Sequence, residues 1–176
     1  MPGAPLLMIA SPTLVSEAEY LSTTYHPDCD FIDGQIQERN LGQKDHSKVQ
    51  GRVFAWFDAR AAQLGIAAFP EMRIQIAHGR YRIPDVCVVK LPEPDEQIFT
   101  APPYIAIEIL STEDTLRRLQ ERFDDYLAMG IVNIWVVDPE SARAWHATAD
   151  GLIQVRDAAL HTTDGAISMP LAAVFF

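Results

Sequence analysis

The 176-residue sequence has few of the features that mark secreted, membrane-spanning or repetitive proteins. It contains only two cysteines, Cys29 and Cys87, which are too few for a disulfide framework and give no paired metal-ligand spacing. No apolar run approaches the roughly 18–20 residues that a membrane helix needs, so no membrane partner is expected. Internal repeats, low-complexity tracts and Ser/Gly-rich linkers are also missing. We therefore expect a cytoplasmic protein with reduced thiols, a single domain over residues 12–176 and a flexible N-terminal tail over residues 1–11.

Positive charge is also scarce, and this bears on the expected partners. The sequence has 14 Lys and Arg against 24 Asp and Glu, a formal net charge of −10, whereas affinity for phosphate backbones comes mainly from clustered basic residues. The bases are concentrated, however, because residues 39–90 hold nine bases and four acids, while residues 1–38 hold six acids and no base. The middle segment could therefore present a local surface to phosphate. The alternative is an ordinary solvated charged surface, which charge counts alone favour.

The sequence does contain an alternation of helical and extended patterns. Apolar residues at helical spacing predict helices over 13–22, 46–64 and 111–129. Extended, β-branched or alternating patterns predict strands over 71–76, 81–89, 104–111 and 131–138. Hairpins are expected around the Asp33-Gly34 and Asp150-Gly151 pairs. The order helix, three strands, helix, strand indicates an α/β protein, and the helix between the last two strands favours a parallel crossover.

Two acidic residues interrupt otherwise apolar strands. Asp85 follows Pro84 in the strand predicted over 81–89, and Glu108 is the only charge in the strand over 104–111. An ionised carboxylate in an apolar strand is costly unless it is paired, hydrogen-bonded or bound to a metal. Mg²⁺ takes oxygen ligands and keeps several waters for a substrate phosphate, so both acids could serve one such cation. The alternative is that each carboxylate caps nearby backbone or pairs with an arginine.

The segments around these acids resemble a known family. In chain order they are FIDGQI after Asp30, HSKVQ from His46, Pro84-Asp85, EILS from Glu108, and RFDDY leading into GIVNIWVVDP. This ordered set is similar to the Uma-type restriction-endonuclease family, a domain of largely unassigned biology in the PD-(D/E)XK nuclease superfamily, and it covers about residues 12–139. The resemblance implies a restriction-endonuclease-like α/β core in the order αβββαβ, with a central mixed sheet flanked by helices. Here a C-terminal β-hairpin would be added to that core.

The resemblance also implies a metal site. Asp85 and Glu108, joined by the backbone carbonyl of Ile109, would bind Mg²⁺ or Mn²⁺. Glu71 is placed on the polar side of its predicted strand, from which it could reach the same cation or remain an exposed edge acid.

Two further residues match positions of the family pattern and could support the site. His46 lies at the start of a predicted helix, where a structural role beside Asp45 is the alternative. Asp30 precedes the Asp33-Gly34 pair and could equally be part of that turn. For both residues the sequence leaves a supporting role and a structural role open.

The site departs from the superfamily pattern at its lysine. In the ExK pattern the Lys lies two residues after the Glu, on the same strand face, but this sequence has Leu110 there. Uma-type sequences characteristically carry a Lys on the following helix, four residues before a Tyr, and counting back from Tyr126 leads to Arg122. Arginine keeps the positive charge and can brace a phosphate bidentately, yet it cannot easily be deprotonated. The alternative for Arg122 is an exposed residue paired with Asp125.

The leading hypothesis is a metal-dependent endonuclease that hydrolyses nucleic-acid phosphodiester bonds, with DNA as the expected substrate. Asp85 and Glu108 would hold the Mg²⁺ that activates water, and Arg122 would stabilise the charge that develops on the phosphate. A second hypothesis is a catalytically degenerate nuclease fold that acts as a nucleic-acid or protein interaction module, which the acidic net charge and the Lys-to-Arg departure favour. A structural dimerisation domain is the third. A homodimer is compatible with the leading hypothesis, because nucleases of this class often act on both strands.

Overall fold

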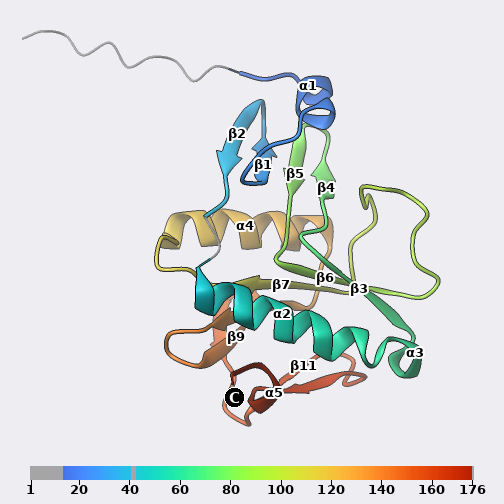
Figure 1. The fold of residues 1–176 in the computed structure, drawn as a ribbon, viewed down its shortest axis with the longest axis vertical. Coiled ribbons are helices and arrows are strands. Elements are labelled where there is room, and N and C mark those ends of the chain that lie inside the picture. The colour runs from blue at the N-terminus through green and yellow to red at the C-terminus, as the bar shows by residue number, and fades with distance from the viewer. Residues whose placement is uncertain (1–13, 41–42, 176) are drawn as a thin grey trace, which may run out of the picture.

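The computed structural model of the chain describes residues 14–40 and 43–175, so the tail expected over residues 1–11 lies outside the described residues (Figure 1). In chain order the elements are α1 (Glu17–Ser22), β1 (Cys29–Ile32), β2 (Gln35–Glu38), α2 (Lys44–Asp58), α3 (Ala61–Leu64), β3 (Ile66–Pro70), β4 (Ile74–Ala77), β5 (Arg80–Arg82), β6 (Val86–Lys90), β7 (Ile105–Ile109), α4 (Leu116–Met129), β8 (Ile134–Asp138), β9 (Arg143–Thr148), β10 (Gly151–Gln154), β11 (Ala159–His161), β12 (Ser168–Pro170) and α5 (Ala172–Phe175).

The strands form one large mixed sheet and two smaller sheets. The large sheet has the order β10-β9-β8-β7-β6-β3, and a four-stranded sheet has the order β2-β1-β5-β4. In the view of Figure 1 the four-stranded sheet lies above α4 and the large sheet below it. β7 and β8 pair in parallel with α4 between them in sequence, which confirms the predicted crossover, and β9 with β10 form the predicted hairpin. The mixed α/β fold expected from the sequence is therefore confirmed.

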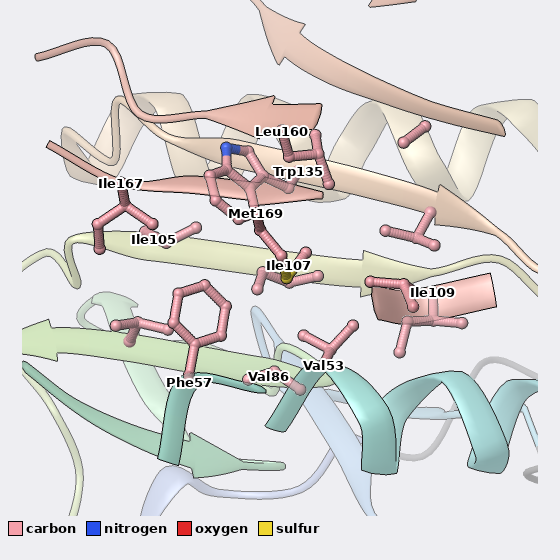
Figure 2. Close-up of a cluster of buried hydrophobic side chains, with 14 of the residues drawn as sticks. Val53, Phe57, Val86, Ile105, Ile107, Ile109, Trp135, Leu160, Ile167 and Met169 are labelled. Carbon is pink, nitrogen blue, oxygen red and sulfur yellow. The ribbon is translucent and has the colours of Figure 1, made fainter. Parts of the chain in front are cut away.

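One face of the large sheet packs against α2 and the C-terminal elements. Val53 and Phe57 on α2 are fully buried in one cluster with Val86 and Ile107 of the sheet. Figure 2 shows the two α2 side chains pointing toward the strands, with the Met169 side chain of β12 reaching toward Ile107 of β7. The helical stripe predicted from the sequence thus faces the core, as expected for an amphipathic helix.

The opposite face of the large sheet packs against α4. Phe123 and Tyr126 on α4 are buried in a second cluster with Ala106 and Val136 of the sheet. Because side chains alternate between the two faces of a strand, Glu108 belongs to the same face as Ala106. The fold therefore directs the Glu108 carboxylate toward α4.

The strand predicted over 81–89 is wrong in one respect that matters for function. It is two strands that belong to different sheets, β5 in the four-stranded sheet and β6 in the large sheet. Pro84 lies in the break, and proline lacks the backbone N–H that a central strand must donate to its neighbour. Asp85 therefore lies directly before β6, at the junction of the two sheets, and not inside a strand.

The start of α4 also differs from the prediction. The Ser111 N–H donates to Asp114 Oδ2 at 2.8 Å, so this pair closes a turn ahead of the helix. The helix itself begins at Leu116, and its N-cap is Thr115, whose hydroxyl accepts from the Arg118 N–H. Short polar side chains bond to nearby backbone both in turns and at helix N-caps. The spacing of Ser111 and Asp114 therefore did not show whether this pair forms a turn or caps the helix.

The other predicted helices are shorter than expected. The helix over 13–22 begins only at Glu17, capped by Ser16, while residue 13 lies outside the described residues. The helix over 46–64 starts two residues earlier and is divided into α2 and α3 after Asp58. None of the helices in residues 14–40 and 43–175 has the length and hydropathy of a membrane span.

The region before β5 contains a strand that was not predicted. β3 runs over residues 66–70, where the sequence lacks a regular alternation of apolar and polar residues. The strand expected over 71–76 begins only at Ile74, because Glu71 adopts a left-handed backbone conformation with φ of 51° between β3 and β4. Such a residue cannot continue an extended strand.

Candidate active site

Asp85 and Glu108 are brought face to face by the pairing of β6 with β7. The antiparallel register places Val86 opposite Ile107, so Asp85 is opposite Glu108 at the end of the ladder. The two side chains are 4% and 1% exposed. The Ile109 N–H donates to Asp85 Oδ2 at 2.7 Å, which fixes the carboxylate against the end of β7.

Each carboxylate has an arginine counter-ion. Arg39, which follows β2 directly, donates through Nη2 to Asp85 Oδ1. Arg122 on α4 donates through Nη1 to Glu108 Oε2 at 2.6 Å, and the Tyr126 hydroxyl donates to Glu108 Oε1. Both guanidinium groups are mostly buried with the acids. The two negative charges are thus balanced by two positive charges, as buried ion pairs require.

α2 contributes two polar side chains that hold Asp85 from the other side. His46 lies in the first turn of the helix, and its Nε2 is 3.3 Å from Asp85 Oδ2. Burial opposes the charged form of the imidazole, but the hydrogen bond to Asp85 and the negative charge of Asp85 together outweigh it and raise the pKa of His46. One turn later, Gln50 Nε2 donates to the backbone carbonyl of Asp85 at 3.1 Å. The helix therefore orients both the side chain and the backbone of Asp85.

The two facing carboxylates have opposite pKa shifts. Burial raises the pKa of Glu108 to about 7, and the nearby Asp85 adds to this while Arg122 opposes it. For Asp85, the hydrogen bond from His46 and the charge of Arg39 outweigh burial and lower the pKa. Like charges at close range cannot both ionise without cost. A second positive charge near Glu108 would therefore stabilise the form of the site in which both carboxylates are ionised.

Glu71 borders the site without lying on a strand. Its Oε1 is 3.8 Å from Arg39 Nη1 and 3.4 Å from Gln50 Nε2, and its side chain is 48% exposed. Its N–H donates to the Asp85 carbonyl at 3.2 Å. The prediction that Glu71 lies on the polar face of a strand is wrong, since the residue is in the turn between β3 and β4. Its contacts place it beside the counter-ion of Asp85.

Asp30 belongs to a buried ion-pair network and not to the neighbouring turn. Its Oδ2 accepts from Arg82 Nη1 at 2.9 Å, and its Oδ1 accepts from the Ile83 N–H at 3.0 Å. Arg82 Nε in turn donates to Asp125 Oδ2 at 2.6 Å. This network joins the four-stranded sheet to α4. Asp125 is thus paired with Arg82 and not with Arg122. The alternative of an exposed Arg122 paired with Asp125 is wrong, because Arg122 is mostly buried and pairs with Glu108.

Two hollows lie near the acid pair, and Asp85 lines one of them. One, of about 400 Å³, lies between the start of α2, the β7–α4 connection and the end of β8. The other, of about 320 Å³, is lined by Arg39, Glu71 and Asp85 among others. His46 lines both hollows. A substrate in the second hollow would therefore contact Asp85, whereas one in the first would contact His46 and neither carboxylate of the pair.

The donor set of the site fits a hard, hydrated cation. Every oxygen of Asp85 and Glu108 already accepts a hydrogen bond, but a carboxylate offers about four lone-pair positions, so coordination positions remain. Across residues 14–40 and 43–175, no group of three or more His, Cys, Asp and Glu could hold a metal by itself. Mg²⁺ usually binds through one or two carboxylates and keeps several waters. The backbone of Ile109 adjoins the pair, as its N–H bond to Asp85 shows.

Several residues of the site had not been singled out from the sequence. Arg39 follows a hairpin with no periodic pattern, and Gln50 shares the polar face of α2 with many residues of similar type. Tyr126 served only to locate Arg122, although a spacing of four residues on one helix places both side chains on the same face. That spacing was the available signal for the shared contact of Tyr126 and Arg122 with Glu108.

The comparisons with known proteins agree on the fold. A family model named Uma2, with the description "Putative restriction endonuclease", matches residues 18–172. The structure is similar to a "putative nuclease belonging to DUF820" from Anabaena variabilis ATCC 29413, with a TM-score of 0.75 and 21% identity over 90% of this chain and 96% of that chain. At that identity the likeness shows the fold alone.

A second similarity is weaker. A chain in a cryo-EM structure of a DrdV–DNA complex has a TM-score of 0.43 and 20% identity, and the match covers 65% of this chain and 10% of that chain. We draw no conclusion from it. A search of curated proteins gives no match.

Proposed function

The chain belongs to the Uma2 family, "Putative restriction endonuclease", and on this premise we propose that it is a Mg²⁺-dependent endonuclease that hydrolyses nucleic-acid phosphodiester bonds, with DNA as the expected substrate. The observation that carries the proposal is the pair of buried carboxylates, Asp85 and Glu108, facing each other across β6 and β7 beside a hollow of about 320 Å³ that Asp85 lines. Two buried like charges need compensation, which Arg39 and Arg122 provide here and which a divalent cation would provide in the proposed nuclease.

The proposed roles follow from the contacts of each residue. Asp85, Glu108 and the carbonyl of Ile109 would hold Mg²⁺ or Mn²⁺, which when bound supplies Lewis-acid polarisation of the phosphate and a lower pKa for water. His46 would keep the Asp85 carboxylate oriented through its contact at 3.3 Å. Glu71, beside Arg39 and largely open to solvent, would shape the approach to the site and is not among the ligands that we propose.

Arg122 would stabilise negative charge and not take up a proton. Its Nη1 donates to Glu108 Oε2 at 2.6 Å, so its positive charge lies directly beside one of the two proposed metal ligands. Arginine stays protonated in proteins, and the neighbouring Glu108 raises the pKa of Arg122 further, against the effect of burial. A lysine at this position could have acted in either way. The presence of arginine in place of lysine thus favours electrostatic stabilisation by this residue and leaves water activation to the metal.

A second candidate function is an interaction module with a nuclease fold. Two observations favour it, namely that both carboxylates are already neutralised by Arg39 and Arg122 and that the net charge is −10. A calorimetric titration with Mn²⁺ separates the candidates. The nuclease requires a binding event that the Asp85→Ala variant lacks, whereas a module without a working site shows the same titration in both proteins.

Cleavage is expected to depend entirely on a divalent cation. Plasmid and single-stranded DNA should be cut in Mg²⁺ or Mn²⁺, remain intact when EDTA is in excess, and be cut again when metal is restored, because the acid pair alone has no group that can activate water. Gel electrophoresis of time courses gives the measurement. Cutting that persists in EDTA would contradict the proposal.

Metal affinity is expected to fall as the pH is lowered. Because burial raises the pKa of Glu108 to about 7, a proton competes with the cation below that pH, and the apparent affinity for Mn²⁺ should weaken by up to about 10-fold for each further pH unit. Calorimetry between about pH 6 and about pH 8 measures this. In the Glu108→Gln variant the affinity should be weak and depend less on pH, with the remaining dependence coming from His46 beside Asp85. A flat profile in the wild-type protein would show that Glu108 is not a ligand.

A further inference from the structure

We propose that Arg39 exchanges partners during substrate binding: it neutralises Asp85 while the site lacks a cation, and it binds a phosphate of the nucleic acid once a divalent cation takes over Asp85. The inference rests on the proposed function and deepens it. It makes the binding of metal and of nucleic acid cooperative, and it assigns Arg39 as a second phosphate-binding residue beside Arg122.

The geometry around Arg39 allows such an exchange. Its backbone is held in place, since the Arg39 N–H donates to the Asp28 carbonyl at 3.3 Å, and the next side chain, Asn40, donates to Ser111 Oγ at 2.7 Å. The guanidinium extends from this fixed point to Asp85 and lines the 320 Å³ hollow. A long side chain on an anchored backbone can redirect its head group while the fold stays unchanged.

The charges of the site supply the driving force. Asp85 and Glu108 carry two negative charges, which Arg39 and Arg122 balance one for one. A divalent cation between the acids would replace both guanidinium charges and leave them without a full partner. Guanidinium groups bind phosphate oxygens through two parallel hydrogen bonds. Glu71, at 3.8 Å and 48% exposed, is a weaker remaining partner for Arg39 than the buried Asp85.

The exchange also accounts for how an acidic protein could bind a polyanion at one place. The net charge of −10 opposes the approach of DNA. Loading the site with a divalent cation would turn a neutral cluster into one with two excess positive charges, at the edge of two hollows. By linkage, DNA must then strengthen metal binding by the same factor as metal strengthens DNA binding.

The test uses the neutral variant Arg39→Met and two readouts that should move in opposite directions. Without DNA, calorimetry should show Mn²⁺ binding about 10-fold tighter than in the wild-type protein, because the competing guanidinium is gone. With Ca²⁺, fluorescence anisotropy of a labelled duplex of about 20 base pairs should show that the metal strengthens wild-type binding about 10-fold and the variant's binding by much less. A gel after each titration checks that the duplex is intact.

Arg60→Met is the matched control, because it removes the same charge from an exposed residue just beyond the far end of α2. It should leave both readouts unchanged. If Arg39→Met does not fold, Arg39→Gln, which keeps an N–H donor for Asp85, is measured with the same expectation. A purely structural role for Arg39 would lower stability without tightening Mn²⁺ binding.

Two results separate this inference from the proposed function. Mn²⁺ binding that Asp85→Ala removes, but that is equal or weaker in Arg39→Met, overturns the exchange and leaves the nuclease proposal standing. The exchange is also overturned, and the nuclease proposal left standing, if Ca²⁺ strengthens DNA binding equally in the wild-type protein and in Arg39→Met. If the wild-type protein shows no Mn²⁺ binding that depends on Asp85, both the exchange and the proposed function are wrong.

Discussion

The Asp85→Ala variant is expected to cut plasmid DNA at least about 1,000-fold more slowly than the wild-type protein in Mg²⁺, because the metal supplies most of the stabilisation of the reaction and Asp85 would be one of its two carboxylate ligands. Asp85 is also the residue on which the polar contacts converge. Its carboxylate is bonded by Arg39, His46 and the Ile109 N–H. Removing it would take away a proposed ligand and leave Arg39 with the more distant Glu71 carboxylate, whose Oε1 is 3.8 Å from Arg39 Nη1.

Initial rates of nicking, measured on gels with protein purified in parallel, give the comparison. Asp58→Ala is the control, since it removes the same charge from an exposed residue at the far end of α2. Circular dichroism before the assay shows whether each variant is folded. Equal rates in the wild-type protein and Asp85→Ala would trace the cutting to a contaminant and remove the basis of the assignment.

The Arg82→Met variant is expected to lose about 3–5 kcal/mol of unfolding free energy, the usual cost of leaving buried charges without their partner. Arg82 is 2% exposed and bridges Asp30 on β1 to Asp125 on α4. Without it, Asp30 keeps only the Ile83 N–H. The four-stranded sheet would then lose its buried ionic contact with α4, the helix that carries Arg122.

Urea unfolding at neutral pH measures this loss. Arg80→Met is the matched control, because Arg80 also pairs with Asp125 but its side chain is 24% exposed, and it should cost about 1 kcal/mol or less. Adding Asp30→Asn to Arg82→Met should recover part of the loss, because the second change removes the unpaired charge. A loss for Arg82→Met no greater than that for Arg80→Met would show that the network does not hold the two parts together.

Local patterns in the sequence were sufficient for much of the fold. Val49, Val53 and Phe57 are among the apolar residues at helical spacing in the segment predicted as a helix over 46–64, and all three are in the core. The helix predicted over 111–129 ends at Met129 as expected, and Gly130 follows it in a left-handed conformation with φ of 96°. Periodicity and special backbone conformations are properties of neighbouring residues, so they can be recognised without knowledge of the tertiary structure.

The break at Pro84 shows where this kind of inference stops. The segment over 81–89 is largely apolar and rich in β-branched residues, so the sequence predicts one strand, yet β5 and β6 belong to different sheets. Which sheet a strand joins depends on partners far away in the chain. The break at Pro84 indicates an interruption but does not say where the two parts go.

The sequence by itself determined that Asp85 and Glu108 are unusual, because a charge in an apolar strand must be compensated. Only the tertiary structure decided how they are compensated: the register of β6 and β7 sets the acids opposite each other, and Arg39 reaches Asp85 from 46 residues away. An ion pair depends on the position and direction of two side chains, which local patterns do not encode. Burial can be inferred from neighbours along the chain, whereas the partner of a buried charge is fixed by the packing of the whole fold.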